Sequence, residues 1–231
     1  MITNYTLILL SGGVGTRMNN PIPKQYMLLA GKPVIMHTLE KADLIEEINE
    51  IIIVCSDEYN SPLKLMVEQY GIKKSIIYAK AGKTRQQSVK SGLLQTENKN
   101  VILHEAARPF VKIEDFMCLI NENAENAILG IDIPFTVVKG FENVEQPLLK
   151  RSELVNVQLP QKFNREILLN AHIQAENEQQ DFTEDASMVC NYYPNVKIKI
   201  CKGKEYNIKL TTATDMIIGE QIYENEFRRR K

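Results

Sequence analysis

The sequence predicts an α/β protein with a Rossmann-like, mostly parallel β-sheet, helices on both faces and a protruding β-hairpin arm. Three observations predict this fold class. Short apolar runs rich in β-branched residues recur along the chain, and segments with helical spacing alternate with them. A later stretch alternates between apolar and polar residues and carries prolines at both ends. The first two patterns indicate a parallel sheet covered by helices, and the third indicates a hairpin.

Each expected strand is a short apolar run. These runs are Tyr5–Leu10, Glu50–Cys55, Ser75–Tyr78, Asn100–Leu103, Ala127–Ile133 and Val196–Cys201. Between the first five, apolar residues three or four positions apart predict helices at Val34–Ala42, Leu63–Tyr70, Arg85–Leu94 and Ile113–Asn121. Near the C-terminus we expect a helix over Asn164–Glu176 and a closing helix that starts within Thr211–Asp215.

The arm is expected at residues 135–158, where alternation and prolines disfavour another helical crossover. With 231 residues and no visible repeat or interdomain linker, the chain is expected to form one domain over residues 1–231. The 4 cysteines and 3 histidines are dispersed and lack the spacing of a zinc site. The cysteines are expected to be free, mostly buried thiols in a reducing compartment.

Charge and hydropathy exclude several classes of partner. A net charge of −1 gives no electrostatic basis for binding nucleic acid or an anionic membrane. No apolar run approaches the roughly 20 residues that span a bilayer, and the N-terminus lacks the features of a secretory signal. These observations predict a cytoplasmic protein whose partners are small molecules.

The segment after the first expected strand, SGGVGTRMNNPIPKQY, combines a glycine-rich turn with cations. It fails the Rossmann fingerprint, which needs a glycine where Met18 stands, and it lacks the Gly-Lys-Ser/Thr of a Walker A loop. Backbone N–H groups in such a turn can still approach an anion closely. The pattern favours a triphosphate site over a plain turn, with candidate residues Ser11, Gly12, Gly13, Gly15, Arg17 and Lys24.

Two more segments follow strands that end at the same edge of the expected sheet. GKTRQQSV adds cations at a helix start, with Gly82, Arg85 and Ser88 as candidates. HEAARPF places Glu105 at the end of a buried strand, with Arg108 close by. A carboxylate in that position can hold a divalent metal or form an ordinary ion pair with neighbouring cations.

The cations matter more as a set than singly. Lys209 lies in the apolar-flanked NIK segment, where a lysine can point from a strand end into an anionic site. Together with one carboxylate, the cations suit a nucleoside triphosphate and a second phosphate; they are Arg17, Lys24, Arg85, Arg108, Arg151 and Lys209. No spacing supports a Ser–His–Asp or Cys–His nucleophile.

Several ordered motifs resemble the cytidylyltransferases that make CDP-linked polyols, from 2-C-methyl-D-erythritol 4-phosphate or ribitol 5-phosphate. The resemblance runs almost end to end and rests on SGGVGTRM, PKQY, GKTRQQSV, HEAARP, Thr136, KRSEL, PQKF, FTEDAS and NIKLTTATD. It implies a GT-A-like nucleotidyltransferase fold, CTP as co-substrate and Mg²⁺ as cofactor. The expected reaction is in-line attack of a polyol phosphate on the α-phosphorus of CTP, with release of pyrophosphate.

The resemblance also implies roles for individual residues. The triphosphate would lie on Ser11 and the glycine loop, with Arg17, Lys24 and Lys209 as catalytic cations. Other CTP contacts would come from Gly82, Arg85 and Ser88, and the metal ligand would be Glu105. The expected acceptor contacts are Thr136, Arg151, Thr183 and Arg108. The arm would reach across a homodimer, so that Arg151 serves the neighbouring subunit.

Three positions depart from the family pattern and leave the acceptor open. Ser11-Gly12 stands where the family usually has Ala-Ala or Ala-Gly, Glu105 stands in place of an aspartate, and Leu159 replaces a threonine. Ala106-Ala107 favours 2-C-methyl-D-erythritol 4-phosphate, and ribitol 5-phosphate is the alternative. A non-catalytic nucleotide-binding module on the same fold is a third interpretation, because a fold alone does not specify an activity.

Overall fold

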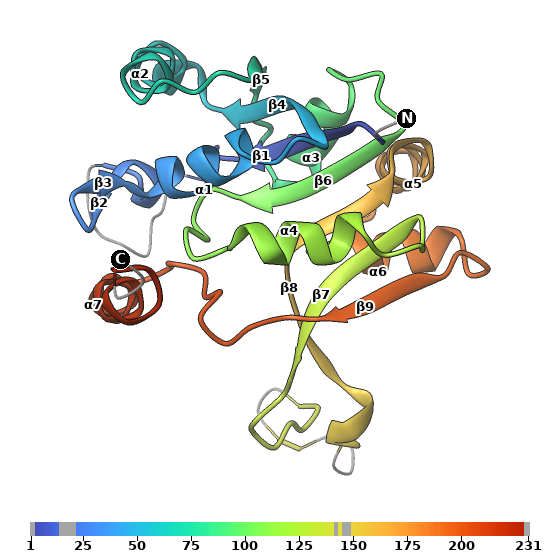
Figure 1. The fold of residues 1–231 in the computed structure, drawn as a ribbon. Helices are drawn as coiled ribbons and strands as arrows, with labels where there is room; N and C mark the ends of the chain where they lie inside the picture. The colour runs from blue at the N-terminus through green and yellow to red at the C-terminus, as the bar shows by residue number, and fades with distance from the viewer. Residues whose placement is uncertain (1–2, 14–21, 141–142, 145–148, 229–231) are drawn as a thin grey trace.

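A computed structural model describes residues 3–13, 22–140, 143–144 and 149–228. In these residues a seven-stranded sheet has the order β5-β4-β1-β6-β8-β7-β9 (Figure 1). The strands are β1 (Tyr5–Leu10), β4 (Ile48–Cys55), β5 (Ser75–Lys80), β6 (Asn100–Glu105), β7 (Asn126–Asp132), β8 (Val155–Asn164) and β9 (Ile198–Lys202). A separate small sheet pairs β2 (Leu28–Leu29) with β3 (Lys32–Pro33).

The sheet is mostly parallel, as predicted. Parallel pairs join β1 to β4, β1 to β6, β4 to β5 and β7 to β9, whereas β8 runs antiparallel to both β6 and β7. The helices are α1 (Val34–Asp43), α2 (Asp57–Gln69), α3 (Arg85–Leu93), α4 (Ile113–Ile120), α5 (Arg165–Asn177), α6 (Asp185–Tyr192) and α7 (Ala213–Tyr223). Shorter helical turns are η2 (Lys24–Tyr26), η3 (Arg151–Glu153) and η4 (Glu224–Arg228).

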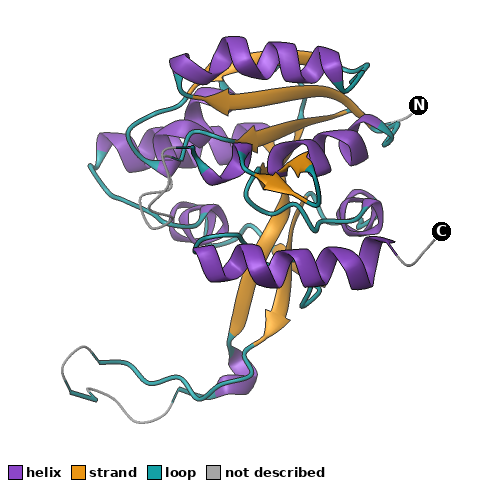
Figure 2. Ribbon diagram, turned by 90° about the vertical axis from the view of Figure 1, so that its left-hand side faces the viewer, coloured by secondary structure: helices purple, strands orange, loops and turns teal. Residues whose placement is uncertain are grey.

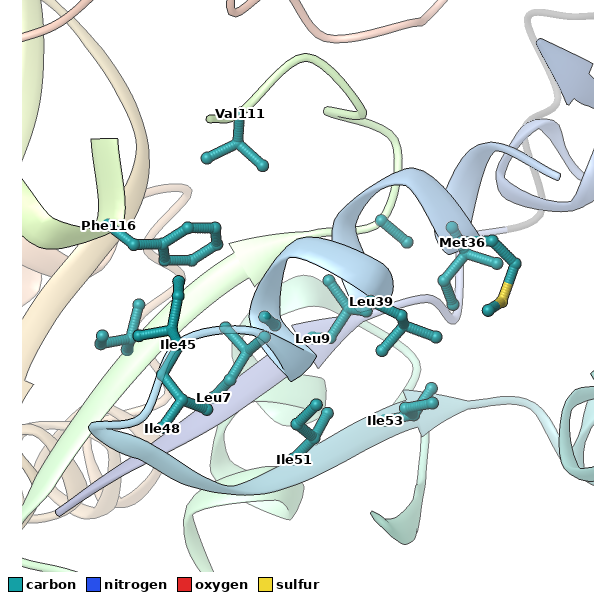
Figure 3. Close-up of a cluster of buried hydrophobic side chains, with 14 of the residues drawn as sticks. Leu7, Leu9, Met36, Leu39, Ile45, Ile48, Ile51, Ile53, Val111 and Phe116 are labelled. Atoms are coloured by element: carbon teal, nitrogen blue, oxygen red, sulfur yellow. The ribbon is translucent and has the colours of Figure 1, made fainter. Parts of the chain in front are cut away.

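Helices cover both faces because side chains of a strand alternate in direction. Leu7 and Leu9 of β1 pack in one core cluster, with residues of α1, α2 and α4 (Figure 3). Ile8, between them, packs in a second cluster on the other face, with residues of α3, α5 and α6. The predicted two-sided sheet is therefore confirmed.

The expected limit of the arm at residue 158 is wrong, because residues 155–158 belong to strand β8 of the sheet. Pro160 disfavours a central strand, since proline donates no ladder hydrogen bond. The structure accommodates it at an irregularity: Ile128 pairs with Gln161, whereas the next residue, Leu129, pairs with Gln158. Leu159 and Pro160 are thereby passed over in the β7 ladder.

Two helices also differ from the sequence prediction. α2 begins at Asp57 instead of Leu63, because Asp57 and Glu58 occupy its first turn, where negative charge is favourable, and exposed Pro62 is tolerated inside the helix. α6 was not predicted as a helix at all. It begins after Glu184, whose side chain accepts hydrogen bonds from the backbone N–H groups of Ala186 and Ser187.

The β7–β8 hairpin extends beyond the helices and carries residues 133–140, 143–144 and 149–154 away from the rest of the molecule (Figure 2). The protruding arm is thus present, and its base is sheet. Within its described residues, Gly140 and Val144 form an isolated antiparallel bridge. Phe135 is 77% exposed at the start of the arm.

Two findings bear on the predicted surroundings of the protein. All four cysteines are free, but only Cys55 and Cys201 are buried, whereas Cys118 and Cys190 are exposed, so the expectation of mostly buried thiols is wrong for half of them. Across the described ranges, every helix is too short or too polar to cross a bilayer.

Candidate active site

A cavity of about 510 Å³ opens at the carboxyl ends of β1, β5 and β6. This is the ligand position expected for an open α/β sheet, because β1 lies where the strand order changes direction. The lining includes these residues singled out in the sequence: Ser11, Gly12, Gly13, Lys24, Gly82, Arg85, Ser88, Glu105 and Lys209. Gly15 and Arg17 lie outside the described residues.

Hydrogen bonds with Val54 and Gln25 hold the start of the glycine loop in place. The backbone N–H of Ser11 donates to Val54 at 2.8 Å. Gln25 Nε2 donates to the carbonyls of Ser11 at 2.7 Å and Gly13 at 2.9 Å. A side chain at Gly12 would place its Cβ 2.3 Å from the Cβ of Ala81, so only glycine lets the two loops approach. Sequence reasoning missed Gln25, although it lies within the PKQY motif.

The loop after β5 is built around the start of α3. Thr84 is the N-cap residue, and its side chain accepts from the backbone N–H of Gln87. Ser88 Oγ accepts from the Gly82 N–H at 3.0 Å and donates to the Thr84 carbonyl at 3.0 Å. The N-terminus of α3 thus meets the cavity, where its dipole favours an anion.

Glu105 lies at the centre of the cation cluster. Lys209 Nζ donates to its Oε1 at 2.9 Å, and Arg85 Nε lies 3.5 Å from the same oxygen. Arg108 Nε contacts Oε2 at 3.4 Å. The structure therefore brings together residues 85, 105, 108 and 209, as the sequence predicted, and it shows the ion-pair alternative for Glu105.

The surrounding charges keep the Glu105 carboxylate ionised. Burial alone would raise its pKa, but Lys209, Arg108 and Arg85 lower the pKa from its ordinary 4.5 to about 2. The side chain of Lys209 is 37% exposed, whereas that of Glu105 is 10% exposed. Lys209 is therefore the partner best able to turn toward a bound anion.

The predicted acceptor residues are not gathered in this cavity. Thr183 is exposed just before α6, and Thr136 is exposed on the arm. Arg151 lies at the base of the arm, where its Nη1 donates to the Pro134 carbonyl at 3.1 Å. Arg108 alone lies beside the site, with its Nη1 donating to Asn207 at 3.0 Å.

Leu159 does not face the cavity. Its side chain is buried in the core cluster shared by β8, α5 and α6, and its carbonyl accepts a hydrogen bond from Asn207 Nδ2 at 2.7 Å. The missing threonine hydroxyl at this position is thus replaced by apolar packing.

A metal at this site would depend on its substrate for ligands. Among the described residues, no group of three or more His, Cys, Asp and Glu side chains could hold an ion. Mg²⁺ is commonly held by one or two carboxylates together with phosphate oxygens and water, so the single carboxylate of Glu105 fits that ion.

Comparisons with known proteins identify the family of this chain. The model of the family "2-C-methyl-D-erythritol 4-phosphate cytidylyltransferase" matches residues 5–225. A protein of that name from Clostridium novyi is 35% identical over 224 residues, which cover 94% of this chain and 96% of the relative. A ribitol-5-phosphate cytidylyltransferase from Lactiplantibacillus plantarum is 30% identical over 229 residues, covering 94% and 97%.

Solved structures show the same fold. A 4-diphosphocytidyl-2C-methyl-D-erythritol synthase from Anaerococcus prevotii superposes with a TM-score of 0.85 at 24% identity and covers 96% of both chains. A 2-C-methyl-D-erythritol 4-phosphate cytidylyltransferase from Francisella tularensis has a TM-score of 0.77 at 25% identity, covering 95% of this chain and 99% of its own. With this match over nearly its whole length, the chain belongs to the 2-C-methyl-D-erythritol 4-phosphate cytidylyltransferase family of enzymes.

Proposed function

We propose that this enzyme transfers the cytidylyl group of CTP to 2-C-methyl-D-erythritol 4-phosphate and releases pyrophosphate. The observation that carries the proposal is the cation cluster around Glu105, which shares one cavity with the glycine loop and the start of α3. A relative named for this acceptor at 35% identity supports the choice of substrate. Free thiols fit a cytoplasmic enzyme.

The reaction needs charge stabilisation more than a strong base. An oxygen of the acceptor phosphate attacks the α-phosphorus of CTP; the new O–P bond forms as the bond to the β-phosphate oxygen breaks. The second pKa of a phosphate monoester is about 6, so the nucleophile is already largely ionised at neutral pH. Lys24, Lys209 and Arg17 neutralise the charge that develops on the phosphoryl oxygens.

Glu105 and Lys209 exchange partners in this proposal. In the ligand-free protein the lysine neutralises the carboxylate. When CTP enters, Lys209 turns to the α-phosphate, and the Glu105 carboxylate would be the protein ligand that holds Mg²⁺. When bound, the ion would supply Lewis-acid stabilisation of the phosphate oxygens. Arg85 and Arg108 remain beside Glu105 and fix its orientation.

The arm completes the acceptor site of a second subunit. We expect a homodimer in which Arg151 and Thr136 approach the partner's cavity, because both lie on the protruding arm and neither lines the cavity of its own chain. Exposed Phe135 offers apolar surface for that contact.

Ribitol 5-phosphate is the second candidate acceptor. It is favoured by the relative named for that substrate, which is 30% identical to this chain. The two acceptors differ in their carbon skeleton but present the same phosphate monoester to CTP. The same catalytic cations therefore serve both reactions.

Pyrophosphate release from CTP tests the function directly. The purified enzyme is given CTP, Mg²⁺ and, in separate reactions, 2-C-methyl-D-erythritol 4-phosphate, ribitol 5-phosphate or glycerol 3-phosphate. We expect the highest kcat/KM with the first acceptor. A higher value with ribitol 5-phosphate would reassign the acceptor, and CTP binding without release from any acceptor would indicate a non-catalytic module.

A further inference from the structure

We propose that Asp185 and His172 are positioning residues of the active site, which fix the guanidinium of Arg85 against Glu105 from behind the cavity wall. Neither residue is among those that line the cavity. The inference rests on the proposed function, because it adds residues to the same site.

A continuous line of polar contacts joins α5 to the end of β6. His172 Nε2 on α5 lies 3.1 Å from Asp185 Oδ1 on α6. Asp185 Oδ2 contacts Arg85 Nη1 at 2.6 Å. Arg85 Nε in turn lies 3.5 Å from Glu105 Oε1. The guanidinium is therefore placed between one carboxylate behind the wall and one carboxylate in the cavity.

Because the Asp185 carboxylate is buried, it needs the contact with Arg85 to compensate its negative charge. The side chain of Asp185 is 0% exposed. Burial alone would raise the pKa of its carboxyl, but Arg85 and the hydrogen bond from His172 lower the pKa below its ordinary value. The group is thus a buried anion, and losing its cation would leave a costly uncompensated charge. Because guanidinium is planar and rigid, anchoring Nη1 also fixes the direction of Nε.

A purely structural role would not need these charges. Around them, α5 and α6 already pack through Leu168, Ala171 and Val189 in one apolar cluster. A buried ion pair adds little net stability compared with apolar side chains of similar size. The contacts from His172 through Asp185 to Arg85 instead give Arg85 a fixed orientation beside Glu105.

The chain offers a matched control on the same helices. Lys90 of α3 pairs with Glu176 of α5, joining the two helices away from the cavity. The variant Glu176→Gln removes this ion pair, just as Asp185→Asn removes the charge that faces Arg85. Glu176 is 58% exposed whereas Asp185 is buried, so Glu176→Gln controls for the loss of an ion pair to α3, and the Arg85→Gln background below tests the link to the site.

The kinetic test compares these variants in pyrophosphate release. We expect Asp185→Asn to lower kcat by about 10- to 100-fold, the scale of a misplaced catalytic geometry, with the KM for CTP changed by less than about 3-fold. Glu176→Gln should match the wild type. In an Arg85→Gln background, Asp185→Asn should cause no further loss, because the two residues act as a unit. An equal fractional loss in both backgrounds would overturn the proposal.

His172 provides a second pair of variants, which keeps the test valid if Asp185→Asn does not fold. His172→Gln retains an N–H donor for Asp185, whereas His172→Leu has none. We expect kcat near the wild-type value for the first variant and about 10-fold lower for the second. Equal kcat values in the two variants would show that the hydrogen bond has no positioning role.

A readout independent of turnover separates this inference from the proposed function. Exchange of the Arg85 Nε–H with solvent is followed by NMR, with its signal assigned by loss in Arg85→Gln. We expect slow exchange in the wild type and in Glu176→Gln, and exchange at least about 10-fold faster in Asp185→Asn. Identical exchange in all three proteins would refute the positioning role. Slow wild-type exchange without turnover on any acceptor would instead refute only the proposed function.

Discussion

At the scale of single residues, Glu105 organises the site. Its position after a buried strand predicted a functional carboxylate, and the structure shows three cations around it. Metal ligation stays a prediction, because it requires Lys209 to move. Two measurements follow from these contacts. One is the activity of a Lys209 variant, and the other is the pH dependence of stability that the ionised Glu105 carboxylate causes.

Replacing Lys209 with alanine should remove most of the activity and leave the fold intact. The side chain is more than one-third exposed. In the proposed mechanism it supplies one cation to the developing phosphoryl charge. Loss of one such group should lower kcat by about 10²- to 10³-fold, by analogy with oxyanion donors. Lys204→Ala, at an exposed position nearby, is the control. Near-normal kcat for Lys209→Ala in pyrophosphate release would contradict the assigned role.

The depressed pKa of Glu105 makes stability depend on pH. A folded-state pKa of about 2 against an ordinary 4.5 corresponds to about 3 kcal/mol of stability. This contribution is present above pH 4.5 and is lost as the pH falls through about 2, because protonation then removes the ion pairs.

Urea unfolding at several pH values measures this contribution. Glu105→Gln should be less stable than the wild type at neutral pH, because three cations lose their shared anion. The difference should shrink as the pH is lowered toward about 3. A constant difference between the two proteins across that range would show that Glu105 does not titrate as described.

At the scale of elements, the wall of the cavity depends on how closely α3 packs on the sheet. Gly92 lies in α3 against β1 and β4, where a Cβ would approach Ile8 Cγ2 to 2.6 Å and Val54 Cγ2 to 3.1 Å. Thr84 and Arg85, at the other end of the helix, line the cavity. Close packing at residue 92 therefore helps to set the place of the helix start.

Gly92→Ala should destabilise the protein, against the usual preference of helices for alanine. Alanine normally favours a helix by about 1 kcal/mol relative to glycine. Here overpacking against Ile8 should cost about 1–3 kcal/mol, measured as the free energy of unfolding in urea. Ser91→Ala, one position earlier in α3, should change stability by less than about 0.5 kcal/mol. A gain in stability for Gly92→Ala would show that α3 can move away from β1 and β4 to accommodate the methyl group.

Elements differed in how well their sequence predicted them. The limits of β1 were predicted correctly because its apolar run ends abruptly at Ser11. The helix α6 was missed because its start depends on the side chain of Glu184, within a motif interpreted only for acceptor binding. In β8, the ladder irregularity that accommodates Pro160 forms with a partner strand about thirty residues away, so local patterns could not indicate it.

At the scale of the whole molecule, the arm and the cavity are separate parts of one chain. The sequence predicted both, and it named most of the residues that line the cavity. It missed Asp185 and Gln25, because their roles depend on contacts made only after folding, such as that between Asp185 and Arg85. The placement of Arg151 by a partner subunit stays a prediction.

Mixing two inactive variants tests whether the arm serves a partner. Lys209→Ala and Arg151→Ala are unfolded together and refolded, so that subunits associate at random. If Arg151 completes the neighbouring site, mixed dimers have one intact site, and activity should return to about a quarter of the wild-type value. No recovery, with dimers present in analytical ultracentrifugation, would place Arg151 in its own subunit's site.

The irregular pairing of β8 has a consequence for how this family can vary. Residues 161–164 pair with β6, the strand that ends in Glu105, and Gln161 and Lys162 also pair with β7. Residues 155–158 pair with β7 alone and lead into the arm. The unpaired Leu159–Pro160 step separates these two stretches. We therefore expect mutations that lengthen, shorten or redirect the arm to leave the register of the catalytic strand unchanged. If the arm completes a partner's acceptor site, as proposed, selection can remodel that site while the residues around Glu105 are inherited intact.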